Sequence, residues 1–144
     1  MFTTKIVTTE QEKELAFDVR KKVFVEEQGI PVTLEIDEHD TTATHFIMLD
    51  DDKTIAAARL REIEPKVGKV ERVCVLPDYR GQHLGVSIMD TIEQFAADQQ
   101  FVQLKLHAQS YAVPFYEKIG YEVTSPEFMD ADIPHRAMKK LLQS

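Results

Sequence analysis

Apolar and polar residues alternate along several short stretches of the chain, and each of these stretches is predicted to form a strand. The alternation is clearest over residues 102–107, where Val102, Leu104 and Leu106 are separated by polar side chains. A strand with this period buries one face and exposes the other. Further strands are predicted over residues 3–8, 44–49, 54–62, 69–76, 121–124 and 136–141, with turn residues at 50–53 and 64–68 separating the three that lie between residues 44 and 76.

Three other segments carry apolar residues at intervals of three and four, which predicts helices. The first begins after Thr9, because Thr9 and Glu12 have the T-x-x-E spacing of a capping box, and it ends at Gly29. The second helix covers residues 84–98 with a single apolar stripe, and a short third helix covers residues 110–118.

The predicted order of elements is β-α-β-β-β-α-β-α-β-β, which indicates an α/β fold. Its middle part is a βαβ unit with parallel strands, and ligands bind where such strands separate. Residues 31–44 are polar and acidic and are predicted to be a solvated loop, with room for a short helical turn. The acidic residues and histidines there lack the spacing typical of a metal site, so no metal is predicted.

Composition narrows the classes of function. The 144 residues suit one domain spanning residues 1–144, and the net charge of −8 disfavours nucleic acid as a partner. No apolar run approaches the roughly 20 residues that a membrane helix needs, and the N-terminus lacks the apolar core of a signal peptide. The single cysteine, Cys74, is expected to be a buried thiol and fits a reducing compartment, so we expect a cytoplasmic protein without a membrane partner.

The most informative segment joins the strand predicted at residues 69–76 to the helix predicted at residues 84–98. It reads V-C-V-L-P-D-Y-R-G-Q-H-L-G. A helix start presents unpaired N–H groups and the positive end of the helix dipole. With Gly81, Gly85 and the guanidinium of Arg80 beside them, these groups are suited to bind a phosphate or a diphosphate.

Two segments together resemble the GNAT superfamily of N-acetyltransferases. Residues 80–85 match its phosphate loop, R/Q-x-x-G-x-G/A, and residues 109–121 resemble its second motif, with F-Y-E-K-I-G-Y at the end and Gln109 in place of asparagine. Residues 19–31 and 128–135 are similar to the small bacterial ElaA/YjcF-like branch. The resemblance implies a GNAT-like mixed, mostly antiparallel central sheet flanked by helices. It also implies direct attack of an amine, from a small molecule or a peptide, on the thioester of acetyl-CoA.

The resemblance further implies where the cosubstrate acetyl-CoA binds. The loop is expected to hold the diphosphate, and the preceding strand is expected to pair with the pantetheine as it would with another strand. His83 stands where the family has glycine, so a positive φ there would strain the backbone. The expected cofactor-binding residues are Val73, Val75, Arg80, Gly81, Gln82, His83, Leu84, Gly85, Val86 and Gln109.

Amine acetylation needs one group that takes a proton and another that gives one. An amine like that of lysine is almost entirely protonated at pH 7, because its pKa is about 10.4. Glu71 shares strand parity with the two valines expected to bind pantetheine, and it is the first candidate base, with Glu27 and Glu35 as others. The resemblance gives Tyr116 the role of acid toward the leaving thiolate, a transfer that is uphill by about 1.5 pKa units.

Two other classes of function stay open at this point. One is a non-catalytic acyl-CoA sensor on the same fold, and the other is an interaction domain with a degenerate loop, which His83 would mark. The sequence does not name the acceptor or the assembly, although a two-fold homodimer is the commonest assembly of soluble proteins. His135 follows Pro134 and could line the acceptor pocket, but a surface or capping role is the favoured expectation.

Overall fold

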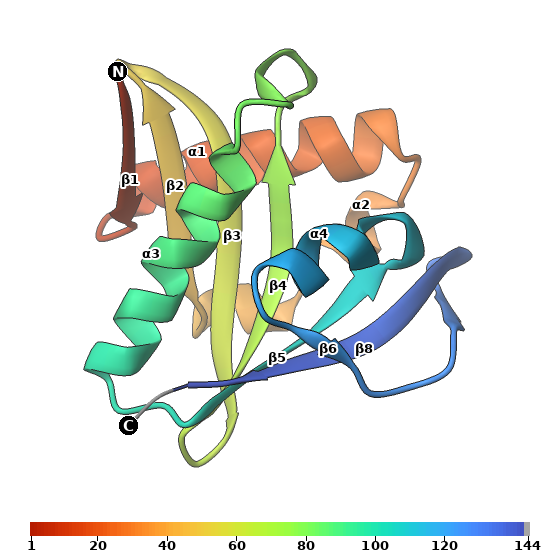
Figure 1. Cartoon of the computed structure of the whole chain (residues 1–144). Helices are drawn as coiled ribbons and strands as arrows, with labels where there is room; N and C mark the ends of the chain where they lie inside the picture. Colours follow the sequence, from red (N-terminus) through yellow and green to blue (C-terminus); the bar gives the residue numbers. More distant parts are fainter. Residues whose placement is uncertain (143–144) are drawn as a thin grey trace.

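The computed structural model describes residues 1–142, which form a mixed sheet with helices on both faces (Figure 1). The strands are β1 (Phe2–Ile6), β2 (Thr44–Asp50), β3 (Lys53–Glu64), β4 (Val67–Val75), β5 (Gln103–Gln109), β6 (Glu122–Val123), β7 (Phe128–Asp130) and β8 (Ile133–Leu141). Their order in the sheet is β1-β2-β3-β4-β5-β8-β6, and β7 pairs with β8. Only β4 and β5 are parallel among these pairs. The predicted fold class is confirmed.

Two long helices cover opposite faces of the sheet. α1 (Glu10–Arg20) packs against β2, β3 and β4, and α3 (Leu84–Asp98) lies across strands β1 to β4 on the other side. The bounds of α3 are those predicted, and its apolar stripe is buried at Leu84, Ile88 and Ile92 and half-buried at Phe95. α4 (Val113–Lys118) packs against β5 and β6 and follows the short 3₁₀ turn η4 (Ser110–Ala112). Within residues 1–142, no helix has both the length and the apolar character needed to span a bilayer.

The first helix differs from its prediction in its second half. Thr9 caps α1 by accepting a hydrogen bond from the backbone N–H of Glu12, as expected. Beyond Arg20, however, the chain continues as the π-helix η1 (Lys21–Glu27). Helical turns of this wider kind are rare and frequently occur at functional sites.

The segment predicted to be a solvated loop is largely ordered. It contains α2 (Val32–Glu35) and the 3₁₀ turn η2 (Glu38–Thr41), and the side chains of Glu35 and Asp40 are buried. The prediction was wrong because these carboxylates pair with arginines that lie far away in the sequence. A second 3₁₀ turn, η3 (Pro77–Tyr79), precedes the loop that leads into α3.

The last hairpin contains a strand that the sequence pattern did not reveal. β7 has three residues, too few for a periodic signal, and it places Phe128 opposite His135 of β8. Ala131 and Asp132 connect the two strands with φ values of 52° and 62°. Positive φ at both central residues is what a two-residue type I′ turn requires. The hairpin therefore brings the side chains of both strands close to the end of β5.

β4 and β5 form the parallel pair that the βαβ pattern predicts, but they pair along only part of their length. The pairing runs from Val67 with Gln103 to Val70 with Leu106. A bulge then interrupts β4, where Arg72 has a φ of 60° and the register with β3 shifts. A bulge bends and twists the strand that carries it. The remaining halves of the two strands consequently diverge and leave space for a ligand.

Candidate functional site

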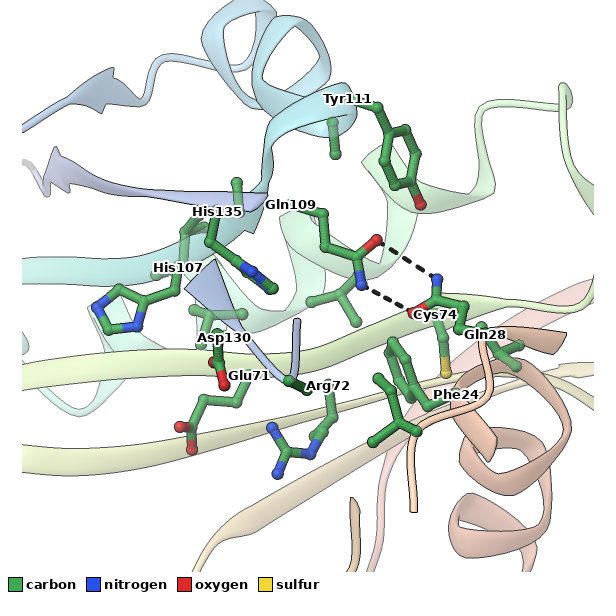
Figure 2. Close-up of a pocket in the computed structure, with 18 of the residues that line it drawn as sticks. Phe24, Gln28, Glu71, Arg72, Cys74, His107, Gln109, Tyr111, Asp130 and His135 are labelled. Atoms are coloured by element: carbon green, nitrogen blue, oxygen red, sulfur yellow. Dashed lines mark hydrogen bonds between the residues drawn. The ribbon is translucent and has the colours of Figure 1, made fainter. Parts of the chain in front are cut away.

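A cavity of about 470 Å³ lies between the diverging ends of β4 and β5 (Figure 2). Side chains of η1, α3, α4 and β8 complete its walls. The lining includes seven residues selected from the sequence, namely Glu71, Val73, Val75, Arg80, Gly85, Gln109 and Tyr116. The other five, Gly81, Gln82, His83, Leu84 and Val86, belong to the loop and to the start of α3 but do not line the cavity.

The start of α3 has the features of an anion site. His83 is the residue before the helix, it has a φ of 61°, and its side chain makes no capping hydrogen bond. The first N–H groups of the helix therefore have no partner from a capping side chain, and they carry the positive end of the helix dipole. The sequence analysis noted that His83 would be strained at positive φ, and this is the conformation that it adopts. Gly81 also has positive φ, at 83°.

Gly85 allows close packing between two helices. A β-carbon at this position would lie 3.0 Å from the ring of Phe115 in α4. The absence of a side chain thus allows α4 to approach the start of α3. This contact positions α4, which carries Tyr116, beside the same cavity.

Arg80 is engaged by protein groups in this structure. Its Nη1 and Nη2 atoms each donate to the carboxylate of Glu27 at 2.7 Å, and its Nε donates to the carbonyl of Val75 at 3.0 Å. The guanidinium therefore joins the loop to η1 and to the end of β4. Glu27, one of the candidate bases, is held in this ion pair, and its pKa is lowered by the hydrogen bonds from Arg80.

Gln109 forms a reciprocal amide pair across the cavity. Its Nε2 donates to the Oε1 of Gln28 at 2.8 Å, and the Nε2 of Gln28 donates in return at 3.4 Å (Figure 2). The amide expected to contact the cofactor is thus bonded to the end of η1, and it links η1 to the end of β5.

Tyr116 is 9% exposed, and its hydroxyl has no hydrogen-bond partner within residues 1–142. Its ring lies edge-on against the rings of Phe115 and Tyr121. Burial raises the pKa of Tyr116 above its usual value, so the hydroxyl keeps its proton at neutral pH. The side chain lies in the cavity wall as a protonated donor whose orientation is fixed by packing.

Glu71 lies in a different setting from the one its strand parity predicts. Because of the bulge at Arg72, Glu71 is opposite Arg59 of β3, while Cys74 is opposite Ala57. Arg59 and Ala57 share a face of β3, so Glu71 shares its face with Cys74, not with Val73 and Val75. The parity argument is therefore wrong, although the side chain still reaches the cavity.

The charge environment of Glu71 also makes it a weak base. Burial by itself would raise its pKa, but a hydrogen bond from Arg61 and the charges of Arg59 and Lys69 outweigh burial and lower the pKa to about 2. Arg61 Nε lies 2.7 Å from the Glu71 carboxylate. A carboxylate with such a low pKa holds a proton poorly at neutral pH.

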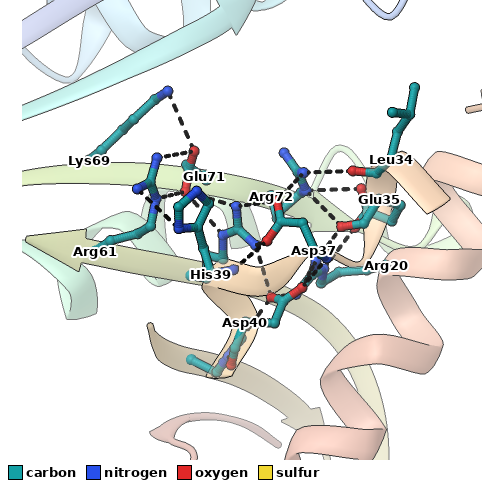
Figure 3. Close-up of polar contacts among 12 residues, drawn as sticks. Arg20, Leu34, Glu35, Asp37, His39, Asp40, Arg61, Lys69, Glu71 and Arg72 are labelled. Carbon is teal, nitrogen blue, oxygen red and sulfur yellow. Dashed lines mark hydrogen bonds and ion pairs between the residues drawn. The ribbon is translucent and has the colours of Figure 1, made fainter. Parts of the chain in front are cut away.

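Glu71 belongs to a larger network of ion pairs beneath the cavity (Figure 3). At its centre, Arg20 and Arg59 are 0% and 1% exposed. Arg20 donates to Glu35 and Asp40 at 2.7 Å each, and Arg59 donates to Asp37 at 2.7 Å and to Asp40 at 2.9 Å. The network is completed by contacts of Arg72 with Glu35 and Asp37. Glu35, the third candidate base, is thereby paired with two arginines.

This network was not predicted from the sequence, although the position of Arg20 in the first helix indicates a buried charge. Arg20 follows Ala16 by four residues on the face of α1 that the sheet buries. A charged residue at a buried position of an amphipathic helix needs a buried partner. That partner was not identifiable from the sequence, because Asp40 is separated from Arg20 by two further short helices.

We expect the protein to lose stability as the pH falls from about 5 toward 2, because the folded state lowers the pKa of Glu71 from 4.5 to about 2. A lowered carboxylate pKa stabilises the fold above the unfolded value, and the contribution disappears as the pH falls through the folded value. For Glu71 this amounts to roughly 3 kcal/mol. Urea denaturation at a series of pH values measures the effect. Glu71→Gln should be less stable at pH 7 and less sensitive to acid, and an unchanged pH dependence would contradict this explanation.

Two further cavity residues have settings that bear on chemistry. Cys74 is buried, as expected, and burial raises the pKa of its thiol to about 12, so it is not an activated nucleophile. His135 was expected at the surface or as a cap, but it is 9% exposed and lines the cavity. That expectation was wrong because the unpredicted strand β7 covers His135.

Comparison with known proteins agrees with this geometry. The acetyltransferase (GNAT) domain model matches residues 6–142. A Bacillus subtilis protein named as an uncharacterized N-acetyltransferase, YjcF, is 44% identical over 139 residues, covering 94% of this chain and 99% of that protein. Escherichia coli ElaA has a TM-score of 0.89 at 23% identity, covering 97% of this chain and 99% of its own. A Pseudomonas aeruginosa acyl-CoA N-acyltransferase has a TM-score of 0.84 at 25% identity, covering 97% and 98%.

In this fold the sheet opens between β4 and β5, beside the start of a helix that no side chain of the preceding residue caps. Together with the family match, this arrangement places the protein in the class of acyl-CoA-dependent transferases. The chain belongs to the GNAT acetyltransferase family, and within it to the ElaA/YjcF-like branch.

Proposed function

We propose that the protein transfers the acetyl group of acetyl-CoA to a primary amine of a small molecule or a peptide by direct attack. The observation that carries the proposal is the divergence of β4 and β5 into a cavity that adjoins the uncapped start of α3. An extended amide-rich pantetheine fits between two strands that have stopped pairing. The diphosphate then reaches the N–H groups of residues 81–86.

The residues proposed to bind acetyl-CoA are expected to contribute unequally to its binding. The backbone of the loop and of the first turn of α3 supports a diphosphate site without any side chain. Arg80 would have to exchange its bonds to Glu27 for bonds to phosphate, so we assign it a smaller share of the binding. Gln109 would likewise have to leave Gln28 before its amide contacts the cofactor.

Direct attack is supported by the absence of an activated thiol from the described part of the cavity. The single cysteine of the chain has a raised pKa of about 12 and a buried sulfur that contacts the carbonyl oxygen of Ala57. A covalent acetyl-enzyme would require a nucleophile activated by a neighbouring base. The amine of the acceptor is therefore assigned as the attacking group, with Tyr116 protonating the thiolate that leaves.

Acetyl-CoA at 100 times its Kd should stabilise the protein by about 2.7 kcal/mol, since it binds the folded state. Thermal unfolding with acetyl-CoA measures this shift. Pantetheine, which lacks the diphosphate, should give a much smaller shift at the same concentration. Equal melting shifts with acetyl-CoA and pantetheine would contradict the diphosphate site. No shift with acetyl-CoA would favour the alternative that the protein is an interaction domain.

Release of the CoA thiol in the presence of amines distinguishes an acetyltransferase from a non-catalytic acyl-CoA sensor. The acceptors are a panel of glycinamide, N-acetyl-lysinamide, tyramine and spermidine, each incubated with acetyl-CoA. We expect thiol release above the rate without amine for at least one of them. A shift in melting without any amine-dependent release would favour the non-catalytic acyl-CoA sensor.

A further inference from the structure

The carboxylates that line or border the cavity and were considered as bases are all held by arginines. Glu27 is paired with Arg80, Glu35 with Arg20, and Glu71 with Arg59 and Arg61. Each of these ion pairs favours the ionised form, and the pKa values of Glu27 and Glu71 are lowered as a result. Burial outweighs the arginines at Glu35 and raises its pKa, but one of its carboxylate oxygens is paired with Arg20 and the other with Arg72, so neither oxygen is free to meet the amine. The proton that the amine must lose needs a different acceptor.

His135 is held in one tautomer by its backbone contact. Its Nδ1 lies 2.7 Å from the carbonyl oxygen of Ile133. A carbonyl oxygen only accepts hydrogen bonds, so the proton of a neutral ring must be on Nδ1. The lone pair is then on Nε2, and no partner for Nε2 is present within residues 1–142. A neutral imidazole nitrogen without a partner is a suitable proton acceptor near neutral pH.

The orientation of the ring is fixed by two neighbouring strands. Phe128 of β7 stacks on His135 with ring centroids 6.0 Å apart and an angle of 21° between the planes. In the sheet, His135 is paired with Gln109, the last residue of β5, where that strand diverges from β4. Figure 2 shows the ring of His135 directed toward the middle of the cavity, whereas the ring of His107 points away from it.

We propose that His135 is the catalytic base, with Nε2 taking the proton that the acceptor nitrogen loses. This assignment rests on the proposed amine acetylation. The ammonium form first loses one proton to solvent. As the neutral nitrogen attacks, the new C–N bond forms, the C–S bond of the thioester breaks, and the second proton passes from nitrogen to Nε2. Tyr116 gives its proton to the leaving sulfur. Solvent then removes the proton from His135 and returns one to Tyr116, so that the cycle balances.

The charged or titratable groups that line the same cavity as His135 affect any pH profile. They are His107 on β5, Asp130 on β7, Tyr111 on η4, Tyr116 on α4, Glu35 on α2, Arg80 in the loop before α3, and Lys69, Glu71, Arg72 and Cys74 on β4. His107 is the second imidazole in this group, and its pKa is lowered by burial and by the charge of Lys69. The test must therefore distinguish the two histidines.

The key variant is His135→Asn, whose amide N–H has about the reach of Nδ1 and can keep the bond to Ile133, but which has no basic nitrogen. With the most active amine of the panel, we expect kcat to fall by about 100-fold or more, because positioned bases contribute roughly that much. The acidic limb of the kcat profile should disappear, and the melting shift with acetyl-CoA should stay unchanged. Free imidazole should restore activity to His135→Ala, which opens room for it.

A histidine outside the cavity and the second histidine of the cavity serve as controls for His135. His39→Asn, which lies outside the cavity, should leave both kcat and its pH profile unchanged. An acidic limb that persists in His135→Asn, or that disappears in His107→Asn instead, would overturn the assignment, as would the absence of rescue in a folded His135→Ala. If the wild-type protein acetylates no amine of the panel, the proposed function itself is overturned and the role of His135 with it.

Discussion

Replacing Arg20 by methionine should lower the free energy of unfolding by about 3–5 kcal/mol, since the change leaves buried carboxylates without their partner. Arg20 is fully buried and donates to the side chains of Glu35 and Asp40 and to the backbone carbonyl of Glu35. Methionine has a similar length and fills the space of the arginine stem, so lost volume contributes little. Urea denaturation at pH 7 measures the difference.

Arg136→Met is the matched control for this prediction. Arg136 is half-buried on β8 and has no ion pair within residues 1–142, so the substitution should change stability by no more than about 0.5 kcal/mol. A loss of less than about 1 kcal/mol in Arg20→Met would mean that the network contributes little. It would then follow that the segment from α2 to η2 is held in place by its apolar contacts.

Tyr116→Phe should lower kcat by about 100-fold or more, while the Kd for CoA stays nearly unchanged. The hydroxyl has no hydrogen-bond partner among the residues that the structure describes, so its removal breaks no hydrogen bond seen there. Its raised pKa makes proton transfer more uphill than the sequence-level difference of about 1.5 units. Burial in the same cavity would also raise the pKa of the leaving thiol, which would offset part of this difference. Steady-state kinetics and calorimetric CoA binding measure the two quantities.

Tyr121→Phe is the control for Tyr116→Phe. Tyr121 is also a buried tyrosine, its ring contacts Tyr116, and its hydroxyl bonds to Glu93 at 3.1 Å, but it does not line the cavity. Its substitution should cost about 1 kcal/mol of stability and leave kcat unchanged. Equal turnover of Tyr116→Phe and the wild-type protein would remove Tyr116 from the mechanism.

The loop before α3 shows how far local sequence reasoning reaches. The strand, the loop and the helix at residues 84–98 were all predictable, because periodicity and glycine placement depend on neighbouring residues. The strained φ of His83 was also foreseen as a consequence of its position. The bonds of Arg80 to Glu27 were not foreseen, since the two residues lie 53 positions apart.

Glu71 shows where the same reasoning fails. Parity along β4 gives the wrong face because one residue, Arg72, adopts positive φ and shifts the register. Nothing in the sequence around Arg72 marks this bulge, as it depends on how β4 pairs with β3. The low basicity of Glu71 follows from Arg59 and Arg61, which come from the neighbouring strand.

The sequence by itself determined the order of the elements apart from the short helices of residues 21–41 and β7, the parallel βαβ unit, and the loop proposed to bind phosphate, because each depends on periodicity or on residues close together in the chain. The tertiary structure decided which proton-transfer groups are free. It pairs Glu27, Glu35 and Glu71 with distant arginines. It also covers His135 with a three-residue strand and leaves its Nε2 without a partner in the described part of the chain, residues 1–142. Basicity depends on burial and on the nearest charges, and folding sets both by bringing distant residues together.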